Sequence, residues 1–304
     1  MKGRIFVAVL LVAAAALAGR WMNRAVAPRA AGTREETRQT FRLDAGARVE
    51  VSAINGKVEI KTGETDTAEV HILRTADSPE ALEYNRVTVE AEPSSLVVRG
   101  ERGGGGGFWR WLSGGRGHSR QEVTLTLPRR VEVSASHVNG ALSVGEVDGE
   151  VEVTHVNGRV EVAQASGRSE VSHVNGGVRV GVSRLGDEGM EVSHVNGNIE
   201  VRFREAVNAD VEVERQNGGL SVNVSNVTMK ERLSRSHSRL RFGTGGVPVR
   251  ISHVNGSIRF ESDAAGAAQA APAFTLGADA PEVEMPPPPP PPAAPPAPPA
   301  PPAP

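Results

Sequence analysis

Apolar and polar residues alternate along much of the chain between Phe41 and Ser262. In the segments Arg159–Val162 and Ser257–Phe260, for example, an apolar residue occupies every second position. A period of two residues places the apolar side chains on one face of a β-strand and the polar side chains on the other. The pattern predicts an all-β protein whose strands each bury one face.

The first part of this region, up to Pro128, predicts separate strands with a short helix between them. Ser78 precedes Pro79, and this pair is typical of a helix start, so a helix to about Tyr84 is expected. The segments that predict strands here are Ala47–Ser52, Lys57–Lys61, Glu69–Arg74, Arg86–Ala91, Ser95–Arg99 and Gln121–Leu127.

A five-residue motif, Ser-His-Val-Asn-Gly, recurs through the second part. It occupies residues 136–140, 172–176, 193–197 and 252–256, with a threonine-headed copy at 154–158 and looser copies at 53–56 and 215–218. Turn-forming pairs ending in glycine come every nine residues from Asn139 to Gly176, so the full unit has 18 residues, and the next two units have 21. Such a period indicates one structural unit used many times.

Two architectures fit this repeat. In an antiparallel meander, or a β-sandwich built from one, each Asn-Gly pair would form a type I′ hairpin turn. In a parallel β-helix or β-solenoid, each unit would be one coil of two short strands stacked on the previous coil. A two-strand coil covers its own valine face, whereas a meander needs a second layer. We therefore expect a β-solenoid with 18–21-residue coils and Asn-Gly corners, with the meander or sandwich as the alternative.

The asparagine and glycine of each motif are expected to shape the corner. Glycine adopts a positive φ at little steric cost, and Asn-Gly pairs are common in tight turns. The serine that heads the motif is expected on the solvent side. The predicted corner residues are Asn139, Gly140, Asn157, Gly158, Asn175, Gly176, Asn196, Gly197, Asn217, Gly218, Asn255 and Gly256.

The composition excludes several classes of function. The chain has 304 residues, a formal net charge of −2 at pH 7 and no cysteine. This charge gives no overall field that would favour nucleic acid as a partner. The lack of cysteine excludes disulfides, thiolate metal sites and cysteine nucleophiles. We expect no cofactor.

The two ends of the chain differ in composition from the repeats. Residues 1–18 have a basic start and an apolar run of 14 residues, typical of a signal peptide or, if uncleaved, a short membrane anchor. Residues 19–40 are expected to be a linker, 41–262 the β-strand-repeat domain and 263–304 a disordered Ala- and Pro-rich tail. We therefore expect an exported protein in the periplasm or on the surface of a bacterium.

The order of these parts resembles a known family. The segment Val123–Pro128, the Asn-Gly repeats and the segment Gly245–Ser252 are together similar to the bacterial β-strand-repeat family called "putative adhesin", whose function is unknown. The resemblance implies an exported or membrane-anchored, β-helix-like domain without catalytic residues. This chain departs from the family pattern in the histidine before each Val-Asn pair, in a tryptophan-bearing loop and in the proline-rich tail.

The histidines of the motif share one repeat position and would stack as a ladder about 4.8 Å apart in a solenoid. A row of imidazoles can bind a transition metal or respond to pH. No carboxylate recurs beside them to orient the rings, as metal ligands usually require, and Arg215 takes the same position in one repeat. We expect a stacked polar column and no metal site at His137, His155, His173, His194 and His253.

Two further features suit contact with a partner. The glycine-rich segment 101–120 is expected to be a mobile loop carrying Trp109 and Trp111, which would touch a membrane, glycan or protein, or fold back onto the domain. Arg235 and Arg239 belong to an alternating basic segment that suits an acidic glycan. Glutamates on neighbouring strands would instead make this an ordinary solvated face.

These observations favour a non-enzymatic envelope protein used for adhesion, scaffolding or self-association. The alternative is a binding module for a polyanionic glycan or a divalent metal, through the arginine face or the histidine ladder. A glycan-active β-helix enzyme is least favoured, because such enzymes gather carboxylates at one site and the glutamates here are spread along the strands. The expected partners are a second copy, or a glycan or protein of the cell envelope, with membrane contact only through an uncleaved N-terminal segment.

Overall fold

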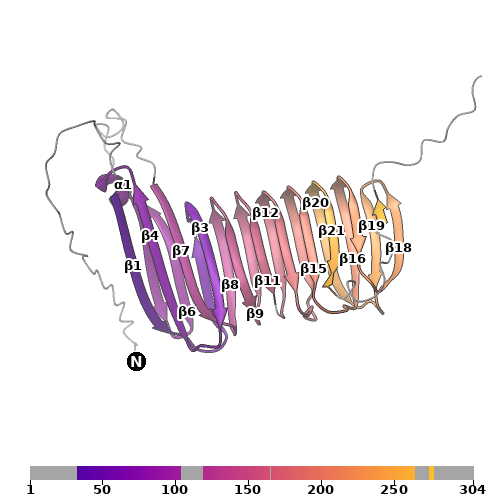
Figure 1. Cartoon of the computed structure of the whole chain (residues 1–304), viewed down its shortest axis with the longest axis horizontal. Helices are drawn as coiled ribbons and strands as arrows, with labels where there is room; N and C mark the ends of the chain where they lie inside the picture. Colours follow the sequence, from indigo (N-terminus) through magenta and orange to yellow (C-terminus); the bar gives the residue numbers. More distant parts are fainter. Residues whose placement is uncertain (1–32, 104–118, 165, 264–273, 277–304) are drawn as a thin grey trace, which may run out of the picture.

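The computed structural model describes residues 33–103, 119–164, 166–263 and 274–276. These residues form two β-sheets of eleven strands each, whose strands lie side by side along the long axis of the molecule (Figure 1). Both sheets mix parallel and antiparallel pairs, and the strand order of neither closes on itself. The prediction of an all-β protein is confirmed.

The N-terminal part contains seven strands and the one helix of the described residues. Ser78 caps this helix as predicted, since its hydroxyl accepts a hydrogen bond from the amide of Ala81 at 3.2 Å. Every strand predicted here is present. The elements are β1 (Thr33–Arg42), β2 (Ala47–Ser52), β3 (Gly56–Gly63), β4 (Thr67–Ala76), α1 (Pro79–Tyr84), β5 (Asn85–Glu92), β6 (Ser95–Arg102) and β7 (Ser119–Pro128).

The repeats form the rest of the structure. From β8 to β17 the chain gives one strand to each sheet in turn, so that each repeat unit is a pair of strands. The strands are β8 (Val131–Val138), β9 (Leu142–Val147), β10 (Val151–Val156), β11 (Val160–Gln164), β12 (Ser169–Asn175), β13 (Val178–Val182), β14 (Met190–Asn196), β15 (Ile199–Phe203), β16 (Ala209–Asn217), β17 (Leu220–Asn223), β18 (Val227–Ser234), β19 (His237–Phe242), β20 (Val247–Asn255), β21 (Ile258–Ser262) and β22 (Phe274–Leu276).

Equivalent strands of neighbouring units pair in parallel. The first sheet has the order β1-β4-β7-β3-β9-β11-β13-β15-β21-β17-β22, and the second has the order β5-β6-β2-β8-β10-β12-β14-β20-β16-β19-β18. The register joins residues one repeat apart, such as Val153 and Val171, or Val162 and Val180. The alternative of an antiparallel meander is therefore wrong for the repeats.

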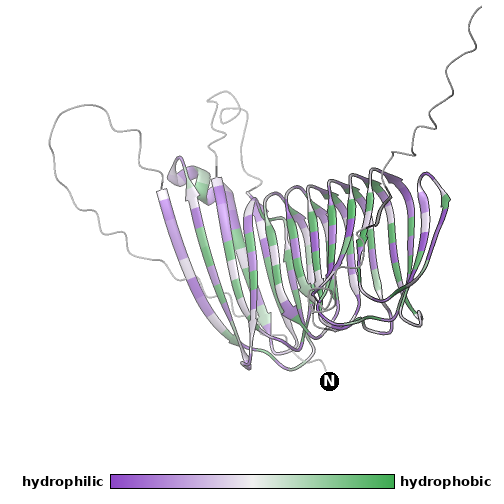
Figure 2. Cartoon of the chain, turned by 45° about the vertical axis from the view of Figure 1, so that its right-hand side comes forward, coloured by the Kyte–Doolittle hydropathy of each residue, from purple (hydrophilic) through white to green (hydrophobic). Residues whose placement is uncertain are grey.

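The alternating apolar residues fill the space between the two sheets. Val153 of β10 and Val162 of β11 are 0% and 1% exposed and belong to one continuous buried cluster. Figure 2 shows the alternation of hydrophobic and hydrophilic residues along the strands. Near the C-terminal end, Phe203, Phe242 and Phe260 pack together with ring centroids 5.7 to 6.4 Å apart. Burial of these apolar side chains is the main stabilising contribution to the fold.

The units are not stacked in chain order at either end. Unit β20–β21 lies between β14–β15 and β16–β17, although it follows both in the sequence. At the other end, β2–β3 lies between β6–β7 and β8–β9. The interval of 38 residues between Asn217 and Asn255 therefore contains a β18–β19 hairpin at the end of the stack and then a return into it.

Antiparallel strands cover both ends of the parallel stack. β1 pairs with β4 and β4 with β7 at one end, while β18 pairs with β19 and β19 with β16 at the other. The outermost strands β1 and β18 carry charges, among them Arg34, Glu36 and Arg38 on β1 and Glu231 and Arg232 on β18, whereas the short edge strand β22 carries none. Charged edge strands oppose pairing with another chain.

Two predicted boundaries need correction. β1 begins at Thr33, inside the expected linker 19–40, because its half-buried positions are mostly polar and gave no apolar alternation. β22 pairs with β17 inside the tail that was expected to be disordered. The predicted signal segment and the proline run lie outside the described residues. Among the residues that are described, no helix has the length and apolar character needed to cross a membrane.

Candidate functional site: the histidine corner

The Ser-His-Val-Asn-Gly motif forms the corner at which each unit passes from the second sheet to the first, here called the histidine corner. The residue in the histidine position of every copy has a left-handed backbone, with φ between 50° and 58°. Histidine is one of the few residue types other than glycine that is enriched in this conformation. The residues in this position are Ala53, His137, His155, His173, His194, Arg215 and His253.

The left-handed residue breaks the two-residue period of the strand. Val153 and Val156 are both buried although they are three residues apart, and His155 between them is exposed. The parallel pairing of β10 with β12 leaves out the histidines: Thr154 pairs with Ser172, and the next pair is Val156 with Val174. The histidine can therefore face solvent while the valines on both sides of it stay in the core.

The structure brings all five motif histidines into one stacked column. The ring centroids are 4.9 Å apart for His137 and His155, 4.8 Å for His155 and His173, and 4.7 Å for His173 and His194. His253 continues the column 4.4 Å from His194, because β20 lies next to β14. Neighbouring ring planes are within 6° of parallel.

Four of these imidazoles have no polar partner among the described residues. The rings of His137, His155, His173 and His194 are exposed and have ring contacts but no hydrogen bond or ion pair. His253 differs, because its Nε2 lies 2.8 Å from Nη1 of Arg215 and its Nδ1 lies 3.2 Å from the hydroxyl of Ser252. Ala53 and Arg215 hold the histidine position beyond the two ends of the column.

The asparagines form a second column beside the histidines. Each side-chain amide donates to the side-chain carbonyl of the asparagine on the neighbouring unit, as Asn157 does to Asn139 at 3.0 Å and Asn175 does to Asn157 at 3.0 Å. The ladder continues in the spatial order of the units, through Asn196, Asn255 and Asn217, and its first rung is Asn55. The type I′ turn that the meander alternative would have required is not formed at these corners, because the left-handed residue is the histidine and not the asparagine.

The corner glycines are required because the backbones of neighbouring units approach closely. Gly158 has a φ of 157°, and a Cβ atom there would lie 2.1 Å from the carbonyl oxygen of Gly140. The same contact recurs between Gly176 and Gly158 at 2.2 Å. No side chain fits at these distances, so the glycines are explained by the packing of units as well as by their φ.

The serine of the motif was expected on the solvent side, and this expectation is wrong for two copies. Ser172 and Ser193 are 7% and 9% exposed. They lie beside each other in register on β12 and β14. In these two copies the histidine that follows, and not the serine, is the exposed polar group.

The predicted basic face is largely neutralised. Nε of Arg239 donates to Glu212 at 3.2 Å, and Arg241 donates to Asp210 at 2.7 Å. The hydrogen bond from Arg239 is the main reason that the pKa of Glu212 lies below its usual value. Arg235 lies in the exposed turn between β18 and β19. The alternative in which acidic side chains balance this face fits the structure.

One group of possible metal ligands lies on this same face. Among the described residues, Glu212, Glu214 and His237 are the only three such side chains whose ligand atoms all lie within 4.8 Å of one another. Nε2 of His237 is 3.3 Å from Glu212 and 3.9 Å from Glu214. Because Arg239 already occupies the same oxygen of Glu212, a cation would have to displace it.

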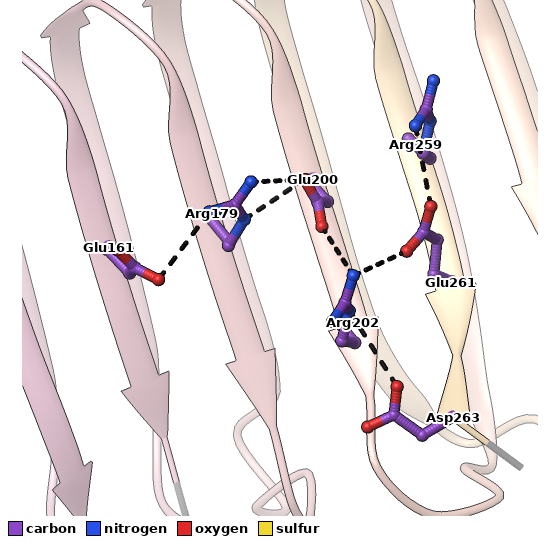
Figure 3. A network of polar contacts seen from close by, with 7 residues as sticks. All are labelled: Glu161, Arg179, Glu200, Arg202, Arg259, Glu261 and Asp263. Carbon is purple, nitrogen blue, oxygen red and sulfur yellow. Dashed lines mark hydrogen bonds and ion pairs between the residues drawn. The ribbon is translucent and has the colours of Figure 1, made fainter.

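The outer face of the first sheet carries a ladder of arginine and glutamate (Figure 3). Arg179 binds Glu200 with two hydrogen bonds at 3.0 and 3.2 Å, and Arg202 bridges Glu200 and Glu261 at 3.2 and 3.0 Å. The hydrogen bond with Arg179 lowers the pKa of Glu200, and the same contact raises the pKa of Arg179. These charges are paired across strands, which is typical of a stabilising surface and not of a binding site.

The members of the histidine column could be identified from the sequence, but their left-handed backbone conformation was not predicted. The signal was present in the spacing, because each motif places two apolar residues three positions apart, as in Val171 and Val174. A break of this kind indicates one extra residue in the strand. Trp109 and Trp111, the other predicted partner contacts, lie outside the described residues.

No protein-family model matches the sequence, and no curated protein matches it. Among solved structures, the chain is similar to a "putative cell adhesion protein" from Clostridium sporogenes, with 11% identity, a TM-score of 0.32 and coverage of 75% of this chain and 100% of that one. It is also similar to a "putative adhesin" from Bacteroides fragilis, with 7% identity, a TM-score of 0.26 and coverage of 74% and 97%.

A third solved structure, a "putative adhesin" from Parabacteroides merdae, has 11% identity, a TM-score of 0.26 and coverage of 74% of this chain and 96% of its own. All three structures come from bacteria and are described by the same kind of name. Their names are of the same kind as the name of the family that the sequence resembles.

Proposed function

We propose that this chain is a non-enzymatic, exported adhesion protein, whose repeat units are the coils of a β-solenoid and whose histidine corner contacts an extended polymer of the cell envelope. The observation that supports this most is the regular column of exposed imidazoles, 4.4 to 4.9 Å apart, beside a hydrogen-bonded column of asparagines. A surface with one short repeat suits a partner that is itself repetitive.

The absence of a gathered reactive group in this corner supports a binding role. The exposed imidazoles have no carboxylate partner among the described residues, whereas a histidine that acts as a general base is usually oriented by one. The nearby glutamates, such as Glu200, are tied to arginines in ladders. The carboxylates of Glu161, Glu200 and Glu261 on this sheet are therefore held in surface ion pairs with arginines.

Adhesion is proposed ahead of self-association because of the ends of the stack. Three of the four outermost described strands, β1, β5 and β18, pair antiparallel with their neighbours and carry charges of both signs, while β22 pairs antiparallel and carries none. Such edges disfavour end-to-end growth. Polyanion binding through Arg235 and Arg239 stays the alternative proposal, although the ion pair of Arg239 with Glu212 weakens it.

Binding of the labelled full-length chain to an array of bacterial envelope polysaccharides tests the proposal. The triple variant His155→Asn, His173→Asn, His194→Asn should lose at least about tenfold in affinity, because asparagine keeps the left-handed backbone but removes the rings. The matched control is Arg184→Asn, Asp187→Asn, Glu188→Gln at the opposite corner, where the side chains are also exposed. No binding by the unmodified chain, or equal loss in both triples, would contradict the proposal.

A further inference from the structure

We propose that the histidine column binds divalent transition-metal ions of the nickel, copper and zinc type, with each ion held between two neighbouring imidazoles. The inference rests on the proposed function only in assigning a binding role to the same corner. It requires neighbouring rings, free ring nitrogens and freedom of the rings to tilt.

The backbone of the corner does not demand histidine. Ala53 and Arg215 adopt the same left-handed conformation, with φ of 58° and 50°, in otherwise equivalent units. The ring is also not needed for burial, since the four imidazoles from His137 to His194 are exposed. A function of the ring itself is therefore the simplest account of its use in five of the seven copies.

The ring nitrogens of these four histidines are available to a ligand. None makes a hydrogen bond or an ion pair with any described residue. A neutral imidazole offers one unprotonated nitrogen, which suits borderline metal ions, whereas calcium and magnesium prefer oxygen ligands. The chemistry of the column therefore favours nickel, copper or zinc.

The spacing of the rings determines how many ions can bind. Equivalent nitrogens of neighbouring rings lie about one strand spacing apart, roughly 4.8 Å. Metal–nitrogen bonds of about 2.0–2.1 Å require the two nitrogens to approach to about 3.3 Å for a tetrahedral ion. Two neighbouring rings can tilt towards each other by this amount, but a ring that tilts towards one neighbour moves away from the other.

Each ion therefore uses two neighbouring histidines, and a column of five holds two ions at most. His253 is the ring best left out, because Arg215 and Ser252 already occupy its nitrogens. The expected pairs are His137 with His155 and His173 with His194. Two imidazoles leave coordination positions open for water or for a group of the partner.

Titration of the metal-free, full-length chain with nickel chloride at pH 7.5, followed by calorimetry, tests this inference without any cell or glycan. The unmodified chain should bind nickel and not calcium. Two double variants lose the same number of histidines but differ in which neighbours remain. His137→Asn with His155→Asn keeps His173 beside His194 and should lose one nickel ion per chain.

The second double variant, His155→Asn with His194→Asn, leaves no two neighbouring rings and should lose two nickel ions per chain. His237→Asn, in the cluster with Glu212 and Glu214, should not change the number of nickel ions that the histidine column binds. Equal loss in the two double variants, loss in His237→Asn alone, or no nickel binding by the unmodified chain would overturn the inference. Thermal melting of each variant verifies that it is folded.

A failure of this titration leaves the polysaccharide-array result unaffected, since that assay contains no added metal. Conversely, nickel binding with the expected loss in each variant would stand even if no polysaccharide bound. The two proposals can therefore fail separately.

Discussion

Arg215 donates a hydrogen bond to Nε2 of His253 at 2.8 Å and so ends the column of imidazoles on its C-terminal side. An arginine side chain has no acceptor atom, so the histidine nitrogen must be the acceptor. Arg215 stands where a sixth histidine would stand, in the same left-handed conformation as the others. His253 therefore has polar partners at its ring nitrogens, whereas the other four rings of the column have none among the described residues.

The first prediction concerns this terminal contact. Arg215→His frees Nε2 of His253 and places a new imidazole next to it, so the number of nickel ions bound per chain should rise by one. The free energy of unfolding should change by less than about 1 kcal/mol, because the side chain is exposed. Arg215→Asn serves as the control, since it frees His253 without adding a ring and should add no ion.

The second prediction concerns the close approach of the glycines. Gly176→Ala should lower the free energy of unfolding by at least about 2 kcal/mol, because the new Cβ atom would lie 2.2 Å from the carbonyl oxygen of Gly158 at a φ of 154°. Urea unfolding measures the change. Gly177→Ala is the control, since a Cβ atom there has no neighbour closer than 3.7 Å. Similar destabilisation by both substitutions would refute the proposed packing.

The third prediction compares an asparagine whose side chain donates a hydrogen bond with one whose side chain only accepts one. Asn196→Asp loses the donor to Asn175 at 3.1 Å and sets two oxygens against each other, so at pH 7 it should destabilise the protein by about 1 kcal/mol. Asn198→Asp should change stability by less than about 0.5 kcal/mol, because Asn198 only accepts a bond, from the amide of Ser257 at 3.0 Å. Thermal unfolding of both variants gives the comparison, and a larger effect at Asn198 would speak against the ladder.

The fourth prediction concerns the dependence of stability on pH. The pKa of Glu200 is lowered in the folded chain, first by the hydrogen bond from Arg179, so the folded state resists protonation more than the unfolded state. The stabilisation is then complete above the unfolded pKa, near pH 4.3, and is lost as the pH falls through the folded pKa. Glu200→Gln should cost no more than about 1 kcal/mol at pH 7, since Arg179 is half-exposed.

This cost of Glu200→Gln should shrink steadily below about pH 4.3, where the carboxyl of the unfolded chain becomes protonated. Glu161→Gln is the matched control, because its contact with Arg179 is 3.8 Å long and half-exposed. It should have a smaller effect at pH 7. Urea unfolding at pH 7 and at pH 3 tests both variants, and a cost of Glu200→Gln that is unchanged at pH 3 would contradict the ion-pair explanation.

The strands and the core could be predicted from the sequence because the valine alternation is regular between the breaks at the histidine positions. Val151, Val153, Val160 and Val162 are all buried as their period requires. β1 was missed because an edge strand with Thr33, Glu35 and Thr37 on its half-buried side has no apolar period to detect. Local patterning predicts an element only where burial demands apolar residues.

The spatial order of the units could not be predicted, because the units are nearly interchangeable. Val195 pairs with Val254, and Val254 in turn pairs with Gln216. Residues 193–197 could pair in the same register with residues 214–218 as they do with residues 252–256. The arrangement of the histidine column was predicted in part, since its members share a repeat position. The left-handed backbone is indicated only by the three-residue spacing of apolar residues such as Val192 and Val195.

The interleaved position of β20–β21 has a consequence for how the chain folds during synthesis. β16–β17 leaves the ribosome first and has the spacing needed to pair with β14–β15, so we expect it to occupy that place until Ser262 has been made. The final order then requires a local pairing to open and accept a segment from later in the chain. Pairing between distant segments is slow, so arrival of the last unit should be the rate-limiting step that fixes the length and ends of the folded stack.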